Sequence, residues 1–154
     1  ISTCPLRQAE CGKRYKRQKA QPESGKKFKE SAMYPFTYER PASLDAAAQL
    51  AAAGGKLLAG GQTLLASMKL RLSSPESLVD LGRIAQLAGI RREGNAIVIG
   101  AMTCHADVAA SADVRAAIPA LAHLASGIGD RQVRARGTLG GSLANNDPAA
   151  CYPS

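Results

Sequence analysis

The sequence predicts a protein of the α+β class, and three patterns carry that prediction. Between residues 34 and 81, short apolar segments alternate with segments rich in helix-forming residues. Two strand-like segments, residues 87–92 and 96–101, flank Glu93-Gly94-Asn95, a sequence typical of a hairpin turn. Residues 105–126 follow the hairpin and are rich in good helix formers. Both halves of the chain are therefore expected to contain strands as well as helices.

The elements of the first half follow from local start and stop signals. Ser43 is a suitable N-cap for a helix, because its hydroxyl can accept a hydrogen bond from the first turn. Gly54-Gly55 can end that helix, since glycine adopts a left-handed conformation without steric cost. The predicted order is a strand at 34–39, a helix between Ser43 and Gly54, a strand at 56–59, a helix at 64–70 and a strand at 78–81.

The helical segment of the second half is predicted in two pieces. Asp107 lies in the first turn of the first piece, Pro119 is suited to open the second, and Gly127 and Gly129 end it. No helix is assigned after Val133, where the sequence is dominated by a glycine-containing stretch.

The composition is that of a folded domain. The chain has 154 residues and a mass of 16.0 kDa, and 45% of its residues are hydrophobic. It contains no apolar run of about 18 residues, so no membrane-spanning helix is predicted. The four cysteines lack the short paired spacing of a metal or iron–sulfur site. Because no secretory signal is recognisable, we expect a cytoplasmic protein with reduced thiols.

The positive charge is concentrated at the start of the chain. The formal net charge is +8 at pH 7, of which residues 1–32 contribute +6 and residues 33–154 only +2. We predict that residues 1–32 form a disordered basic tail that is either vector or linker sequence or a native basic arm. A basic tail leaves a nucleic-acid binder open as an alternative function, although the nearly balanced body argues against it.

The segment Ala59-Gly60-Gly61-Gln62-Thr63 has the composition of an anion-binding loop. A phosphate needs several backbone N–H groups at close range, and glycines leave the approach open. A helix that starts directly after the loop adds unpaired N–H groups, and Thr63 adds a hydroxyl. The segment lacks the spacing of a Walker loop or a G-x-G-x-x-G fingerprint. A tight strand-to-helix turn without a ligand is the alternative.

The segment Thr138-Leu139-Gly140-Gly141-Ser142 repeats this pattern with a double glycine between hydroxyl residues. Two such loops could hold a diphosphate from opposite sides, or they could be unrelated turns. Arg131, Arg134 and Arg136 precede the second segment. They either help to attract an anionic cofactor or a partner subunit, or form a solvated basic surface.

From Met33 onward, the sequence resembles the FAD-binding subunits of molybdenum hydroxylases, most closely the medium subunits of aerobic carbon monoxide dehydrogenases. The stretches that carry the resemblance are Tyr34–Pro41, Leu58–Leu65, Met68–Leu72, Leu78–Leu81, Ile99–Thr103 and Gly137–Ala149. The resemblance implies a PCMH-type FAD-binding fold in two lobes. Residues 33–85 would form the small N-terminal α/β lobe, and residues 86–154 the start of a larger, truncated mixed α+β lobe.

The resemblance also implies a cofactor and a set of contacts. FAD would be bound non-covalently, with Ala59, Gly60, Gly61, Gln62 and Thr63 on one side of its diphosphate and Thr138, Leu139, Gly140, Gly141 and Ser142 on the other. Electrons would pass from iron–sulfur clusters through FAD to an external acceptor. The molybdenum cofactor and the [2Fe-2S] clusters would belong to a large and a small partner subunit. No catalytic residue, metal site or nucleic-acid contact is expected in this chain.

Two departures from the family pattern leave a second hypothesis open. The family usually has an aspartate where this chain has Cys151, and cysteine is a poor hydrogen-bond acceptor for an FAD hydroxyl. The family's FAD domain also continues beyond the position of Ser154. The alternative function is therefore a truncated product that no longer binds FAD.

Overall fold

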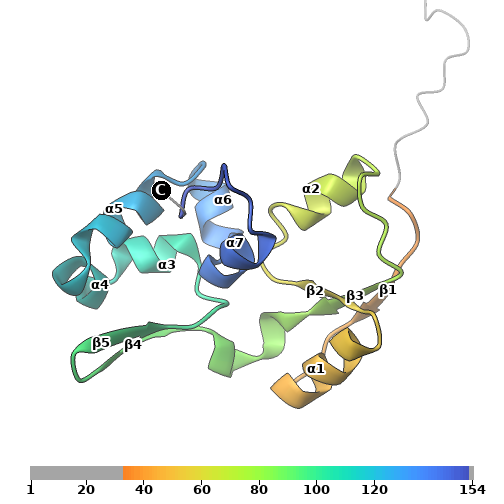
Figure 1. Ribbon diagram of the computed structural model, residues 1–154, viewed down its shortest axis with the longest axis horizontal. Helices are drawn as coiled ribbons and strands as arrows, with labels where there is room; N and C mark the ends of the chain where they lie inside the picture. The colour runs from red at the N-terminus through yellow and green to blue at the C-terminus, as the bar shows by residue number, and fades with distance from the viewer. Residues whose placement is uncertain (1–32, 153–154) are drawn as a thin grey trace, which may run out of the picture. The chain divides into compact units, whose positions relative to one another are not determined.

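A three-stranded parallel sheet forms the first part of the described chain (Figure 1). The computed structural model describes residues 33–152, so the predicted tail at residues 1–32 lies outside the described residues. The sheet has the order β1-β3-β2, and both outer strands run parallel to the central one. Its strands are β1 (Thr37–Glu39), β2 (Lys56–Leu58) and β3 (Ser77–Asp80). All three predicted strands are confirmed, with the first shorter than expected.

Two helices connect the parallel strands, and Figure 1 shows them on opposite sides of the sheet. In α1 (Leu44–Ala52), the Ser43 hydroxyl accepts a hydrogen bond from the backbone N–H of Ala46 at 3.3 Å, as the N-cap prediction requires. Gly54 follows the helix with a φ of +99°. The second helix is α2 (Leu64–Lys69), which begins directly after the first glycine segment. Both predicted helices are confirmed.

The core of this part lies between α1 and the sheet. Ala47, Val79 and Ile84 are buried, and partly buried leucines pack around them. The central strand contributes the most deeply buried side chains, because both of its edges are paired and its faces are covered. This packing fixes the carboxyl ends of the three strands relative to one another.

Two short 3-10 helices, η1 (Leu81–Arg83) and η2 (Ala85–Leu87), lead from the sheet to a β-hairpin. The hairpin consists of β4 (Ile90–Glu93) and β5 (Ala96–Ile99), paired antiparallel with Ile90 opposite Ile99. The predicted hairpin is therefore confirmed, with shorter strands. Its isoleucines pack against the buried cluster Val108, Val114, Ala122 and Ala125 of the following helices.

The segment after the hairpin forms three helices, so the prediction of two pieces was wrong. They are α3 (His105–Ala110), α4 (Ala112–Ala117) and α5 (Pro119–Gly127). Ser111 separates the first two with an extended conformation, and its hydroxyl accepts a hydrogen bond from Val114 N–H at 3.3 Å. A single serine thus ends one helix and caps the next. Pro119 opens α5, as predicted.

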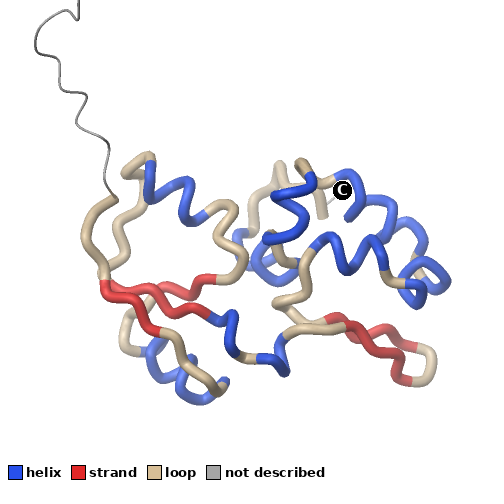
Figure 2. Tube along the Cα trace, turned by 180° about the vertical axis from the view of Figure 1, so that it is seen from behind, coloured by secondary structure: helices blue, strands red, loops and turns tan. Residues whose placement is uncertain are grey.

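Two further helices at the end of the described chain were not predicted. α6 (Arg131–Arg136) is capped by Asp130, whose carboxylate accepts a hydrogen bond from Val133 N–H at 2.8 Å. α7 (Leu139–Asn145) is capped by Thr138. The second glycine segment is therefore the first turn of a helix and not a loop. The tube view in Figure 2 shows these helices gathered with α3 and α5 away from the three-stranded sheet.

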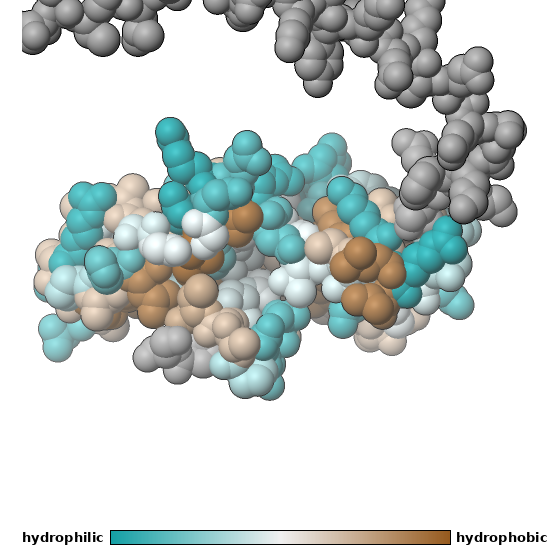
Figure 3. Space-filling view, turned by 90° about the horizontal axis from the view of Figure 1, so that it is seen from above, coloured by the Kyte–Doolittle hydropathy of each residue, from teal (hydrophilic) through white to brown (hydrophobic). Residues whose placement is uncertain are grey.

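The face shown in Figure 3 carries hydrophilic side chains together with separate apolar patches. The most exposed large apolar side chains are Leu70 and Leu72, at 69% and 78%. Among residues 33–152, no helix has the length and apolar character needed to cross a membrane. Cys104 and Cys151 are free thiols.

Candidate functional site

The two glycine segments lie against each other in the structure. A Cβ atom on Gly60 would lie 2.0 Å from the carbonyl oxygen of Arg136 and 2.9 Å from the Cα atom of Gly137. A Cβ atom on Gly141 would lie 3.4 Å from the Cβ atom of Ala59. The loop after β2 and the end of α6 therefore meet through backbone that only glycine at position 60 allows to approach so closely, and the start of α7 lies beside the same loop.

The first segment offers backbone donors to a ligand. Within residues 33–152, the N–H groups of Gly60, Gly61, Gln62 and Thr63 make no hydrogen bond to the protein. The loop is held from within, because the Gln62 side-chain amide donates to the Gly60 carbonyl at 3.1 Å. Gly61 has a φ of +74°, which strongly favours glycine at this position. Several adjacent unpaired N–H groups suit an anionic oxygen.

The second segment uses its backbone donors inside the protein. Leu139 N–H donates to the Thr103 carbonyl at 3.0 Å, and Gly140 N–H donates to the Ala101 carbonyl at 2.9 Å. Gly141 N–H donates to the Thr138 hydroxyl at 3.1 Å. A Cβ atom on Gly140 would lie 2.6 Å from the Cβ atom of Ala101. In this structure, the double glycine therefore serves close packing, and the N–H groups of this turn are already paired.

An open cleft of about 280 Å³ adjoins the first segment. Its lining includes Leu58 and Asp80, the last residues of β2 and β3, and Leu65 of α2. Open parallel sheets usually bind ligands near the carboxyl ends of their strands. The cleft is lined by Phe36, Tyr38, Leu58, Ala59, Gly60, Gly61, Leu65, Leu78, Asp80 and Arg136. Of the ten predicted site residues, only Ala59, Gly60 and Gly61 line it. The remaining seven lie outside its lining.

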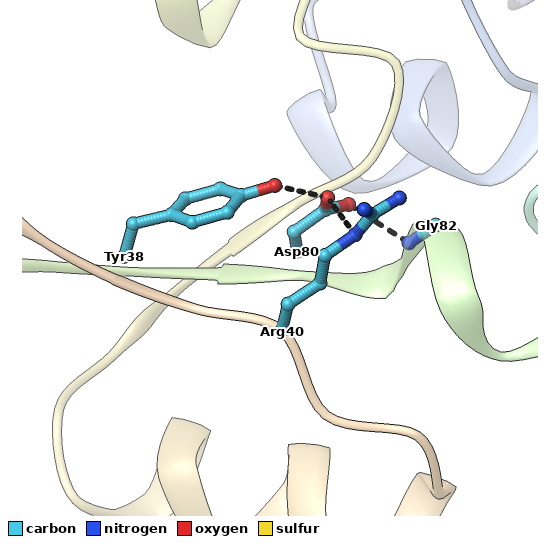
Figure 4. A network of polar contacts seen from close by, with 4 residues as sticks. All are labelled: Tyr38, Arg40, Asp80 and Gly82. Atoms are coloured by element: carbon cyan, nitrogen blue, oxygen red, sulfur yellow. Dashed lines mark hydrogen bonds and ion pairs between the residues drawn. The ribbon is translucent and has the colours of Figure 1, made fainter.

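A network of polar contacts lies in this cleft and was not predicted from the sequence (Figure 4). The Tyr38 hydroxyl donates to one carboxylate oxygen of Asp80, which also contacts Nε of Arg40 at 3.0 Å. The other carboxylate oxygen accepts from Gly82 N–H at 2.8 Å. The available signal was the position of Asp80 near the carboxyl end of the strand predicted at 78–81, because neighbouring parallel strands bring their carboxyl ends to one edge.

These contacts hold Asp80 in its charged form. Burial raises the pKa of Asp80, but the hydrogen bonds from Tyr38 and Gly82 and the charge of Arg40 outweigh it, so the pKa lies below 3.8. The same hydrogen bond to Asp80 raises the pKa of Tyr38 above 10.0. Tyr38 is therefore a neutral donor, and Asp80 is a carboxylate whose charge is offset within the protein.

A second polar contact, between His105 and Tyr152, lies next to Gly137, shortly before α7 begins. Nδ1 of His105 and the hydroxyl oxygen of Tyr152 are 2.9 Å apart, and their rings are 5.3 Å apart. The backbone N–H of His105 donates to the Gly137 carbonyl at 3.0 Å. Burial lowers the pKa of His105 and raises the pKa of Tyr152 to about 12. This pair joins the end of the described chain to the residue that precedes Thr138.

No group of three or more histidine, cysteine, aspartate or glutamate side chains placed to hold a metal ion occurs among the described residues. The donors left to a ligand in the cleft are backbone N–H groups and Arg136, because the Asp80 carboxylate already engages the Tyr38 hydroxyl and Arg40. Such a donor set suits an anionic organic ligand.

Residues 34–154 match the protein family described as the FAD-binding domain in molybdopterin dehydrogenase. This chain belongs to that family. The match covers both glycine segments and the strands that position them. The family description therefore applies to the same part of the molecule that carries the cleft.

Members of this family from several organisms are similar in sequence. The carbon monoxide dehydrogenase medium chain of Hydrogenophaga pseudoflava is 48% identical over 122 residues, which is 77% of this chain and 42% of the relative. The glyceraldehyde dehydrogenase medium chain of Sulfolobus acidocaldarius is 38% identical over 125 residues, covering 79% of this chain and 44% of the relative. The chain thus spans less than half the length of these family members.

Solved structures of this family share the fold. A structure of a carbon monoxide dehydrogenase from Hydrogenophaga pseudoflava covers 76% of this chain and 42% of the matched chain, with a TM-score of 0.74 and 48% identity. The structure of quinoline 2-oxidoreductase from Pseudomonas putida covers 77% of this chain and 42% of the matched chain, with a TM-score of 0.75 and 36% identity. The predicted α+β, PCMH-type FAD-binding fold is confirmed.

Proposed function

We propose that this chain binds FAD as part of the medium subunit of a molybdenum hydroxylase similar to carbon monoxide dehydrogenase. The diphosphate would be held between Ala59–Thr63 and Thr138–Ser142. The observation that carries the proposal is the contact between these two segments in a chain of the FAD-binding family. The assignment of residues 33–85 and 86–154 to two lobes belongs to the same proposal.

The residues present fit a diphosphate, although the two segments contribute differently. The first segment supplies the unpaired N–H groups of residues 60–63. The second segment, through Gly140 and Gly141, allows α7 to pack closely enough to bring Thr138–Ser142 beside the first. Within residues 33–152, the hydroxyls of Thr63 and Ser142 make no hydrogen bond, so each remains available to a phosphate oxygen.

In the complete enzyme, this chain would bind and orient the flavin, which supplies the redox chemistry. Iron–sulfur clusters of a small subunit would deliver electrons, and an external acceptor would remove them. A large subunit would carry the molybdenum cofactor and act on the substrate. We propose these roles because the relatives are named as medium chains of dehydrogenases. A cytoplasmic location is part of the same proposal.

Flavin retention in glycine variants tests the proposal. The full chain is incubated with FAD and desalted, and bound flavin is measured by its visible absorbance. Gly61→Val places a branched side chain in the loop, and Gly141→Val places one between the two segments. Both are expected to lose flavin. Gly94→Val is the matched control, because Gly94 has a φ of +60° in the hairpin turn and a Cβ atom there would meet nothing within 4 Å.

Loss of flavin in the two segment variants, with retention in the Gly94 control, supports the diphosphate site. Equal flavin retention in all three variants contradicts the placement of the site. A wild-type chain that retains no flavin favours the alternative of a chain without FAD binding.

A further inference from the structure

Arg136 is the exposed last residue of α6, and it belongs to the lining of the cleft together with Gly60 and Gly61. Within residues 33–152, its guanidinium makes neither an ion pair nor a hydrogen bond. Its backbone is firmly held, because its carbonyl lies against Gly60 and the next N–H, of Gly137, donates to Val133 at 2.7 Å. A fixed backbone therefore places Arg136 at the cleft, and its guanidinium has no protein partner in the described part of the chain.

The other charges near the cleft are already compensated. The ionisable side chains of its lining are Tyr38, Asp80 and Arg136. Tyr38 is neutral, and the charge of Asp80 is offset by Arg40 at 3.0 Å. The cleft lining thus keeps one positive charge without a protein partner in the described part of the chain. Such a charge favours an anionic ligand group beside the unpaired N–H groups of residues 60–63.

The neighbouring arginines of α6 differ from Arg136. Arg134 donates from Nη1 to the carbonyls of Ile128 and Gly129, at 3.0 and 2.8 Å, and so stabilises the turn before the helix. Arg131 is exposed at the start of the helix and is not part of the cleft lining. Of the three arginines in the sequence cluster, only Arg136 combines a place in the cleft with an unused guanidinium.

We propose that the Arg136 guanidinium binds a phosphate oxygen of the dinucleotide, as a fixed cation next to the N–H groups of the first glycine segment. This inference rests on the proposed FAD-binding function and adds a residue to it. Guanidinium is suited to the role because its planar N–H groups can pair with two phosphate oxygens at once. Backbone N–H groups alone would leave much of the diphosphate charge unbalanced.

The test compares Arg136→Gln with Arg131→Gln in the full chain. Both variants remove one positive charge from the same helix, but only the first removes it from the cleft. FAD affinity is measured by fluorescence titration, and ADP is used as a competitor because it carries the diphosphate without the flavin ring. Arg136→Gln is expected to raise the Kd for FAD about tenfold, the loss typical of one charged hydrogen bond. ADP competition should weaken in parallel.

Ionic strength provides an independent readout. Added salt should weaken FAD binding to the wild type and to Arg131→Gln, because it screens an exposed charge pair. The salt dependence should be shallower in Arg136→Gln, and Arg136→Lys should recover part of the affinity. Circular dichroism confirms that each variant is folded.

Unchanged FAD and ADP affinities in a folded Arg136→Gln variant overturn the proposal while leaving FAD binding intact. Equal losses in Arg136→Gln and Arg131→Gln also overturn it, because they indicate a general charge effect. If the wild type binds no FAD, the proposed function fails first, and this inference fails with it.

Discussion

The Cα atom of Gly60 faces the carbonyl group of Arg136 so closely that a Cβ atom would lie 2.0 Å from its oxygen. Backbone, rather than a flexible side chain, occupies the space that the Cβ atom would need. The contact joins the loop after β2 to the peptide before Thr138, and so fixes the distance between the two glycine segments.

Gly60→Ala is therefore expected to destabilise the fold by about 1–3 kcal/mol, the usual cost of overpacking. It should also weaken FAD binding, because the two segments must move apart. Denaturant unfolding and FAD titration measure the two effects. Gly127→Ala is the matched control, since a Cβ atom there would meet nothing within 4 Å. Equal effects of the two substitutions would argue against a close segment contact.

Thr138 caps α7 with its hydroxyl and is 4% exposed. Thr138→Ala should lower the free energy of unfolding by about 1 kcal/mol, as expected for the loss of an N-cap. Thr138→Ser keeps the acceptor for Gly141 N–H and should cost less. Urea unfolding of the two variants tests the difference. A serine variant as unstable as the alanine variant would show that the cap contributes nothing.

His105 should make the protein less stable in mild acid. Burial lowers the pKa of His105 below 6.5 in the folded state, so the unfolded chain takes up the proton at a higher pH. The neutral His105 side chain makes its full contribution to the free energy of unfolding above pH 6.5. This contribution is lost as the pH falls from 6.5 to the pKa of His105 in the folded state. Urea unfolding across this range measures the slope. His105→Gln should flatten it, and an unchanged slope would contradict the prediction.

Protonation of Asp80 should lower the stability of the protein at a more acidic pH than protonation of His105 does. Its folded-state pKa is below 3.8, so its contribution is present above that pH and is lost as the pH falls through the lower value. Tyr38→Phe removes the hydrogen bond to the carboxylate and should shift this loss to higher pH. Thermal unfolding between mild and strong acid measures the shift. Tyr34→Phe, which alters a tyrosine outside the cleft, should leave the acid profile unchanged.

The first half of the fold was predictable because its signals are local. Ser43 bonds to the helix that it caps, and Gly54 takes up the left-handed conformation that ends the same helix. The first glycine segment was found for a similar reason, since it lies between a strand and a helix that both follow from sequence pattern. Hydrogen bonds within a few residues determine these features.

α7 could not be predicted in the same way. Gly140 and Gly141 lie in its first turn, and each glycine disfavours a helix by about 1 kcal/mol relative to alanine. The turn is nevertheless helical because Leu139 and Gly140 donate to carbonyl groups at residues 101 and 103, which are distant in sequence. Tertiary contacts outweigh the local preference here.

The cleft itself also depends on tertiary structure. Tyr38, Asp80 and Arg136 come from three separate elements, and sequence spacing does not bring them together. The sequence analysis left the arginine cluster between two interpretations, an anion-attracting group and a solvated surface. The structure distinguishes its members, because Arg134 bonds to carbonyl groups and Arg136 lines the cleft.

Hydrogen–deuterium exchange of the full chain with and without FAD tests the central claim most directly. The N–H groups of residues 60–63 have no protein partner in the described chain, whereas those of Leu139–Gly141 are already paired. FAD is expected to slow exchange strongly at residues 60–63, slightly at 139–141 and not at all at the Gly94 turn. Bound FAD with unchanged exchange at residues 60–63 would contradict the proposed diphosphate site.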